Sequence, residues 1–259
     1  MAIKYLDAKR LQGTNAERLA LTTGEPTFED NFSSDDWTGC KNDACDSGAP
    51  TTVTISGGDL SAVSVDVASD DRLRKALGLT LSNTAWVCRF EANVSSTGTH
   101  TTLIGLVDSG GNMNNTSILC DYNASNKIRM AEYNSGLTLM GSGISISTGT
   151  QYYVTVIRTA LDGLTLEVRT GSHSGSLVGS ESGTITGATD LDHVQSGAYG
   201  RGTGTATWDI DNVKIWNGVT SAPSLSYPSL PNGTIFNETD TYKYFMFDGT
   251  DTWNQMVSS

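Results

Sequence analysis

The chain has 259 residues, of which 37% are hydrophobic and 17% are charged, and this composition indicates a folded protein rather than a disordered one. Its formal net charge is -12 at pH 7, which excludes the basic surface that nucleic acids and anionic membranes select. No run of 18 apolar residues is present, so we also expect no membrane insertion.

We interpret residues 1–22 as an N-terminal arm, because this is the most basic part of the chain and its strand and helix signals are short. The segment lacks the apolar core of a secretory signal peptide, so we expect no cleaved leader. The arm is either a partly ordered tail or an anchor that docks on a neighbouring subunit.

Short segments of strand character, with turn-forming clusters between them, run through residues 23–222. A single helical turn is expected, at residues 70–78. The segments predict ten strands, at residues 51–56, 59–66, 85–94, 101–109, 116–123, 127–134, 151–160, 164–171, 193–200 and 206–217. Strands without alternating helices predict an all-β fold, a two-sheet antiparallel jelly-roll sandwich.

The composition changes over residues 223–259, where three of the five prolines mark an extended linker. Aromatic-rich strand patterns follow and predict a small C-terminal three-stranded β-meander. A meander of this size buries little core by itself. We therefore expect it to pack on the sandwich or on another chain, which favours a homo-oligomer.

The four cysteines leave their pairing open. Cys40 and Cys45 flank a short loop, in which a disulfide or two free thiols would fit. Cys88 and Cys120 each lie in the middle of a predicted strand, either as small buried residues or as a cross-strand disulfide.

The last predicted strand of the sandwich carries Asp209 and Asp211 directly before Val213 and Ile215. Strict alternation would place all four side chains on one face of the strand. This face is then either the wet end of a strand or a site for a cation, since carboxylate oxygens are ligands that calcium accepts.

The order of four motifs resembles the concanavalin A-like lectin/glucanase superfamily, including its laminin G-like jelly rolls. In chain order, these motifs are FEDNFSSDDW (residues 28–37), AWVCRFEANV, QYYVTVIRTALDGLTLEV and WDIDNVKIW. The resemblance spans about residues 25–218 and implies a sandwich whose last strand holds a structural calcium. It implies Asp211 as a ligand, because the sequence DNVKI from Asp211 onward follows the family pattern. Asp30 and Asp209 are our further candidates for this calcium site.

The two ends of the chain resemble terminal segments of structural proteins from tailed and environmental viruses. The residues that carry this resemblance are Thr234, Phe236, Thr239, Asp240, Thr241, Asp248, Gly249 and Trp253. The resemblance implies a virion protein whose partners are its own copies or other virion proteins.

The catalytic pattern of the glucanase branch, Glu-x-Asp-x-x-Glu on one strand, is not found in the sequence. That pattern would place a nucleophile and an acid on one strand face. The acids of the predicted strands, such as Glu91, Glu132 and Glu167, are isolated or wrongly spaced. We therefore expect a protein that is not an enzyme and has no catalytic residues.

A saccharide site would combine aromatic ring faces with planar polar groups. The candidates near predicted loops are Trp37, Tyr122, Tyr199 and Arg201. By contrast, the size of the sandwich favours Trp86, Trp208 and Trp216 as core or edge-packing residues.

Together these features predict a non-enzymatic structural protein of the virion surface, such as a fibre, decoration or receptor-binding subunit, that binds host surface glycans. One alternative is a cellular carbohydrate-binding adhesin or extracellular filament subunit at the cell surface. The other is a glycoside hydrolase-like protein that lacks the usual catalytic motif.

Overall fold

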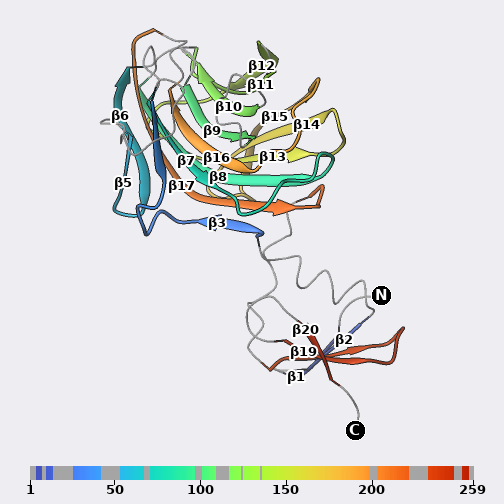
Figure 1. Cartoon of the computed structure of the whole chain (residues 1–259). Helices are drawn as coiled ribbons and strands as arrows, with labels where there is room; N and C mark the ends of the chain where they lie inside the picture. The colour runs from blue at the N-terminus through green and yellow to red at the C-terminus, as the bar shows by residue number, and fades with distance from the viewer. Residues whose placement is uncertain are drawn as a thin grey trace. The chain divides into compact units, whose positions relative to one another are not determined.

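The computed structural model describes the chain over twelve ranges, and every regular element within them is a β-strand. These ranges are residues 4–7, 10–13, 26–41, 53–66, 71–96, 101–108, 117–123, 125–134, 136–198, 203–221, 233–247 and 253–256. None of them contains a helix that is long and apolar enough to cross a bilayer. The chain divides into two compact units, which we name the sandwich unit (Thr27–Ser221) and the terminal unit (Met1–Pro26 with Ala222–Ser259) (Figure 1).

Two antiparallel sheets form the sandwich unit, which confirms the predicted all-β sandwich (Figure 1). Sheet I has the order β15-β14-β13-β8-β17-β6-β5, and β3 also pairs with β17. Its strands are β3 (Phe28–Asp30), β5 (Val53–Ser56), β6 (Asp59–Asp66), β8 (Trp86–Ser96), β13 (Gln151–Arg158), β14 (Gly163–Thr170), β15 (Ser176–Thr184) and β17 (Thr205–Asn217).

Sheet II has the order β12-β11-β10-β9-β16-β7-β4. Its strands are β4 (Thr38–Lys41), β7 (Asp71–Ala76), β9 (Thr101–Val107), β10 (Ser117–Asn123), β11 (Lys127–Tyr133), β12 (Leu137–Ser145) and β16 (His193–Ala198). The helical turn expected at residues 70–78 is wrong, because the backbone of β7 pairs with β16 on one side and β4 on the other.

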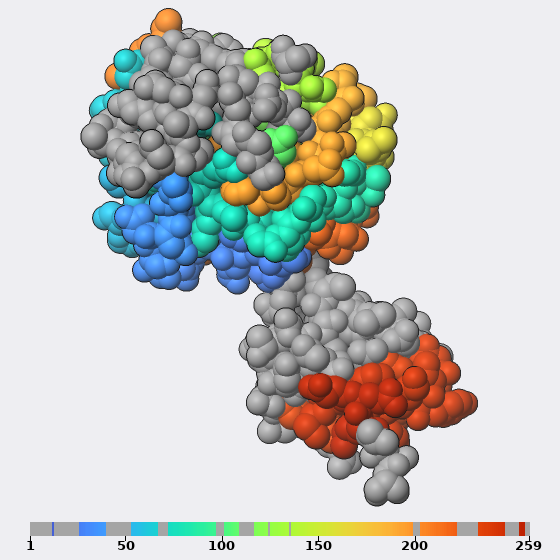
Figure 2. All heavy atoms as spheres, viewed as in Figure 1, coloured from blue at the N-terminus to red at the C-terminus, as the bar shows by residue number. Residues whose placement is uncertain are grey.

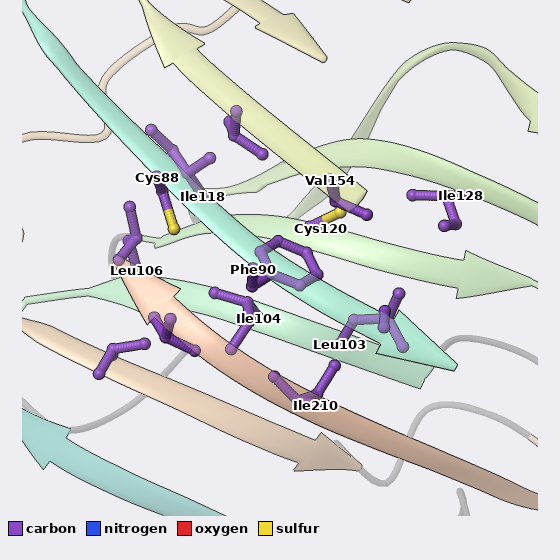
Figure 3. Close-up of a cluster of buried hydrophobic side chains, with 14 of the residues drawn as sticks. Cys88, Phe90, Leu103, Ile104, Leu106, Ile118, Cys120, Ile128, Val154 and Ile210 are labelled. Carbon is purple, nitrogen blue, oxygen red and sulfur yellow. The ribbon is translucent and has the colours of Figure 1, made fainter. Parts of the chain in front are cut away.

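The hydrophobic core lies between the two sheets, and Figure 3 shows side chains from both of them meeting in it. In β8, alternation directs Cys88, Phe90 and Ala92 into the core, where each is at most 1% exposed. Each buried Phe, Leu or Ile contributes about 1.5–3 kcal/mol to folding. The same alternation places the intervening residues, Arg89 and Glu91, on the outer face of sheet I.

A β-bulge interrupts β17 at Asp211 and Asn212. The pairing with β8 changes register between Asp211 and Lys214, and Asn212 has a φ of 51°. The extra residue reverses the alternation of the strand. The prediction that Asp209 and Asp211 share a face with the apolar residues after them is therefore wrong. The core-facing residues of this segment are Trp208, Ile210, Val213 and Ile215.

Glu181 of β15 fastens sheet I to the edge strand β12 of sheet II. Its carboxylate accepts hydrogen bonds from the N–H groups of Ser142 (3.1 Å) and Gly143 (3.0 Å) and from the Ser142 hydroxyl (3.0 Å). Gly141 has a φ of 72°, and a Cβ there would lie 2.5 Å from the Glu181 carboxylate. This edge therefore depends on a glycine at position 141.

Glu132 of β11 holds the connection between β15 and β16. Its carboxylate accepts the N–H groups of Thr186, Gly187 and Ala188 at 2.7–2.9 Å, and also the Thr186 hydroxyl. Arg158 of β13 binds the same connection by donating to the Ala188 carbonyl at 2.6 Å. Both buried charges thus have structural partners.

The terminal unit contains one sheet with the order β1-β2-β18-β19-β20. Its strands are β1 (Lys4–Asp7), β2 (Arg10–Gly13), β18 (Ile235–Glu238), β19 (Tyr244–Phe247) and β20 (Trp253–Met256). The predicted antiparallel meander is confirmed as β18–β20, and in Figure 2 the red atoms of these strands form one surface patch. The sequence did not predict that β2 of the N-terminal arm pairs in parallel with β18.

Candidate functional site

Asp30, predicted as a calcium ligand, is instead part of a buried polar cluster. Its carboxylate accepts the Phe32 N–H (2.7 Å), the Trp37 indole N–H (2.9 Å) and the Lys75 ammonium (2.7 Å). Lys75 lies on β7, so this ion pair joins β3 of sheet I to sheet II. The partners of Asp30 are therefore donors of the protein itself.

Asp209 and Asp211 lie on the outer face of sheet I and have separate partners. Asp209 accepts a hydrogen bond from the Ser61 hydroxyl, and Asp211 accepts two from Asn212. Within the described ranges, no group of three or more His, Cys, Asp or Glu residues is placed to hold a metal ion. The structure thus does not bring the predicted donor set together, and calcium binding at Asp211 stays a hypothesis.

The aromatic residues predicted to bind saccharides are buried where the structure describes them. Trp37 is 6% exposed and donates to Asp30, and Tyr122 is 0% exposed and donates to Asn126 at 2.8 Å. Neither ring offers a face to a ligand, because both are packed in the core, so this expectation is corrected. Tyr199 and Arg201 lie outside the described residues.

Cys88 of β8 and Cys120 of β10 are free, buried thiols on opposite sheets (Figure 3). Burial raises the pKa of Cys88 to about 12, and burial together with Cys88 and Asp121 raises the pKa of Cys120. Both are neutral core residues, which is the first of the two predicted alternatives. The Cys40 side chain and Cys45 lie outside the described part, so their pairing stays a prediction.

Two polar rows cross the outer face of sheet I over β14, β13, β8 and β17. The residues of each row are cross-strand partners, and their side chains share one face. We name the first the bulge row, formed by Arg169, Tyr153, Glu91 and Asp211. The second is the arginine row, formed by Glu167, Thr155, Arg89 and Lys214. All of these side chains are partly exposed except Thr155, which is buried.

Asn212 holds the two carboxylates of the bulge row together. Its side-chain amide donates to Glu91 Oε1 at 3.0 Å and to Asp211 Oδ2 at 2.9 Å. Burial and the nearby charges of Asp59 and Glu91 raise the pKa of Asp211. A bulge with a left-handed non-glycine residue and a perturbed carboxyl is typical of functional sites.

His173 lies over the same face from the turn between β14 and β15. Its ring meets the Tyr153 ring edge-on at a centroid distance of 5.4 Å, and its Nδ1 lies 3.4 Å from the Thr155 hydroxyl. Burial, Arg89 and Lys214 lower the pKa of His173 to about 4. At neutral pH the imidazole is therefore uncharged and offers one donor and one acceptor.

The outer face of sheet II also carries polar side chains, and four of those on its strands are buried. Arg72 of β7 and Gln195 of β16 are 0% exposed. Asp121 and Arg129 are buried beside each other and form an ion pair at 3.0 Å. A ligand in solution reaches exposed groups, so we place the candidate site on the outer face of sheet I.

Tyr153, Arg89 and His173 are not among the candidate site residues predicted from the sequence. The first two carried a signal, since strand alternation in β13 and β8 already assigns them to the face opposite the core. His173 carried none, because the position of a turn over a sheet follows from tertiary structure.

No protein-family model and no curated protein matches the chain. The structure is similar to the GH43 protein BlXynB from Bacillus licheniformis, with 13% identity and a TM-score of 0.48 over 73% of this chain and 39% of that one. It is similar to Trypanosoma rangeli sialidase, with 15% identity and a TM-score of 0.44 over 66% of this chain and 27% of that one. It is also similar to a protein of unknown function from Shewanella oneidensis MR-1, with 14% identity and a TM-score of 0.48 over 82% of this chain and 98% of that one. The chain therefore spans less than half of the first two proteins, and likenesses at this level carry no argument about function.

Proposed function

We propose that the chain is a non-enzymatic surface protein of a larger assembly, such as a virion, and that its sandwich unit binds saccharides. The order of the two units along the chain supports separate roles, attachment for the terminal unit and binding for the sandwich unit. The sandwich unit is inserted in the sequence between the two halves of the terminal unit. The two halves are joined in one sheet, because β2 pairs with β18. A module inserted in this way has both of its connections in one small unit, which suits attachment by that unit.

The observation that carries the saccharide-binding proposal is the bulge row with its neighbours. Tyr153 and His173 supply aromatic rings, and Glu91, Asp211 and Asn212 supply carboxylate and amide groups beside them. Such planar groups make directional hydrogen bonds with hydroxyls, and an aromatic ring covers the apolar face of a sugar. These groups are partly exposed on a single sheet face, so a ligand reaches them together.

The partners of the carboxylates favour recognition over hydrolysis. The Glu132 carboxylate accepts hydrogen bonds from backbone N–H groups. Asp30 forms an ion pair with Lys75, and Asp121 forms one with Arg129. A retaining glycosidase needs one carboxylate free to attack and another that gives up a proton. Glu91 and Asp211 instead share the Asn212 amide, an arrangement that keeps both as hydrogen-bond acceptors.

Binding of the purified full chain to a panel of immobilised oligosaccharides tests this function. We expect Tyr153→Ala and Glu91→Gln to weaken the binding at least about tenfold, the value of one or two lost hydrogen bonds or ring contacts. Asp162→Asn, in the exposed β13–β14 turn, is the matched control and should bind as the wild type does. A wild-type chain that binds no saccharide would reject the ligand part of the proposal.

The attachment role has a separate test. Mass spectrometry of purified particles should detect this chain in stoichiometric amounts, and the isolated chain should self-associate or bind other particle proteins. A monomeric chain that is absent from particles would reject this role. Release of reducing sugar ends by the wild-type chain would favour the hydrolase alternative instead.

A further inference from the structure

The three cations on the outer face of sheet I differ in their partners. Arg169 forms an ion pair with Glu167 at 3.2 Å, and Lys214 forms one with Glu29 at 2.6 Å. Arg89 lies beside Lys214 in the arginine row. Its side chain makes no hydrogen bond or ion pair with any residue that the structure describes, and its Nε is buried without an acceptor. Glu167 and Glu29 are thus paired with the other two cations of this face.

The Arg89 guanidinium lies over the indole of Trp216, with its carbon 5.6 Å from the ring centroid. Trp216 is 1% exposed, so the surface under the guanidinium is fixed by the packing of β17. Stacking on an aromatic face orients a guanidinium and leaves its N–H groups free to point sideways. The indole therefore restricts the orientation of the Arg89 guanidinium.

Lys214 is the direct cross-strand neighbour of Arg89. Like charges in that position destabilise a sheet unless an anion lies near them. Glu29 compensates Lys214 alone, and Glu167 is paired with Arg169. Among the three cations of this face, Arg89 is therefore the one without an ion-pair partner within the described ranges.

His173 and Thr155 border this position from the other side. Burial, Arg89 and Lys214 each lower the pKa of His173. The imidazole is neutral at pH 7, so it contributes hydrogen-bonding groups without competing with Arg89 for charge. The carboxylates of Glu91 and Asp211 lie in the adjacent bulge row, with Asn212 directed at both.

We infer that Arg89 binds the anionic group of an acidic saccharide, a carboxylate or a sulfate, while the sugar ring lies across Tyr153 toward the bulge row. The inference rests on the proposed saccharide-binding function of the same face and specifies its ligand class. A guanidinium pairs two N–H groups with two oxygens of a carboxylate or sulfate, and hydrogen bonds of this kind are about twice as strong as neutral ones.

The test compares three oligosaccharides of equal length, one neutral, one carboxylated and one sulfated, by calorimetry on the full chain. We expect at least one acidic ligand to bind about tenfold or more tightly than the neutral one, with an advantage that salt reduces. Arg89→Gln should abolish the advantage, and Arg89→Lys should restore only part of it. Lys127→Gln removes a cation from β11 of sheet II, outside the proposed site, and should keep the advantage.

An acidic advantage that is absent from the wild type, or unchanged in Arg89→Gln, overturns the inference and leaves the proposed function standing if the neutral ligand binds. Failure of all three ligands rejects the proposed function, and a second measurement then decides on Arg89. Inorganic sulfate should raise the pKa of His173, followed by its imidazole NMR signals, in the wild type but not in Arg89→Gln. No such rise in the wild type overturns the inference.

Discussion

The two sheets of the sandwich unit both carry polar side chains on their outer faces, but these faces differ in exposure. On sheet II, Arg72 and Gln195 are completely buried and Asp121 is 3% exposed. On sheet I, Glu91, Arg89 and Asp211 are all partly exposed. Polar groups without access to water have to be satisfied within the protein, whereas partly exposed ones are available to a ligand. We therefore expect substitutions on sheet II to affect stability and those on sheet I to affect binding.

Among the substitutions that test this comparison, Asp121→Asn on sheet II should lower the free energy of unfolding most. The substitution removes the anion from the buried ion pair with Arg129, whose side chain is then left charged in a site of low exposure. Breaking a buried pair on one side costs about 3 kcal/mol or more. Urea denaturation should show this loss, while Glu91→Gln on sheet I should change the free energy of unfolding by less than about 1 kcal/mol. Equal losses from the two variants would contradict the distinction between the faces.

The sequence predicted the central strands of both sheets because their patterns are local. Strands such as β8 and β13 alternate apolar and polar residues, and β-branched or aromatic residues support them. The edge strands β12 and β15 were missed. Both are rich in glycine and serine, and they are held by tertiary contacts such as those of Gly179 with Ile144 and Gly183 with Met140. Such contacts leave no periodic signal in the sequence.

The site was predicted less well than the fold, and the bulge in β17 explains much of the difference. An alternating pattern through Asp209, Asp211 and Val213 is what a regular strand would show, and only the pairing with β8 reveals the extra residue. The predicted saccharide residues Trp37 and Tyr122 were chosen because they lie near loops. Position near a loop says little about exposure, and both rings are core residues in the structure.

His173, which lies over the outer face of sheet I, provides the next test of the difference between the two sheets. The test uses the pH dependence of the free energy of unfolding. Its pKa is lowered to about 4 in the folded chain, so between about pH 4 and 6.5 the unfolded chain binds more protons than the folded one. This contribution to stability is complete above about pH 6.5 and is lost as the pH falls toward 4. The pKa shift sets an upper limit of about 3 kcal/mol on this contribution. Solvent screening of the partly exposed ring makes the actual contribution smaller.

Denaturation curves from pH 7 to pH 4 should show a smaller decrease in stability for His173→Gln than for the wild type. Arg89→Gln should have a similar but weaker effect, since Arg89 is one of the two cations that disfavour protonation of His173. Parallel curves for the wild type and His173→Gln would mean that the ring does not lie against the cations of the arginine row.

Asp211→Asn has the smallest expected effect on stability. It distinguishes the two roles considered for the Asp211 carboxylate, binding a saccharide and holding a structural calcium. The pKa of Asp211 is raised, so the folded chain disfavours its charged form, and the stability from this group falls as the pH rises through the range above 3.8. An asparagine keeps an oxygen for the Asn212 N–H and removes the charge near Asp59 and Glu91. At pH 7 we therefore expect the free energy of unfolding to change by no more than about 0.5 kcal/mol, a neutral or stabilising effect.

A structural calcium at Asp211 predicts the opposite: Asp211→Asn and a chelator would each lower the melting temperature, and the two effects would not add. Melting curves of the wild type and Asp211→Asn, each with calcium and with chelator, therefore show whether the Asp211 carboxylate serves saccharide binding or holds a calcium ion.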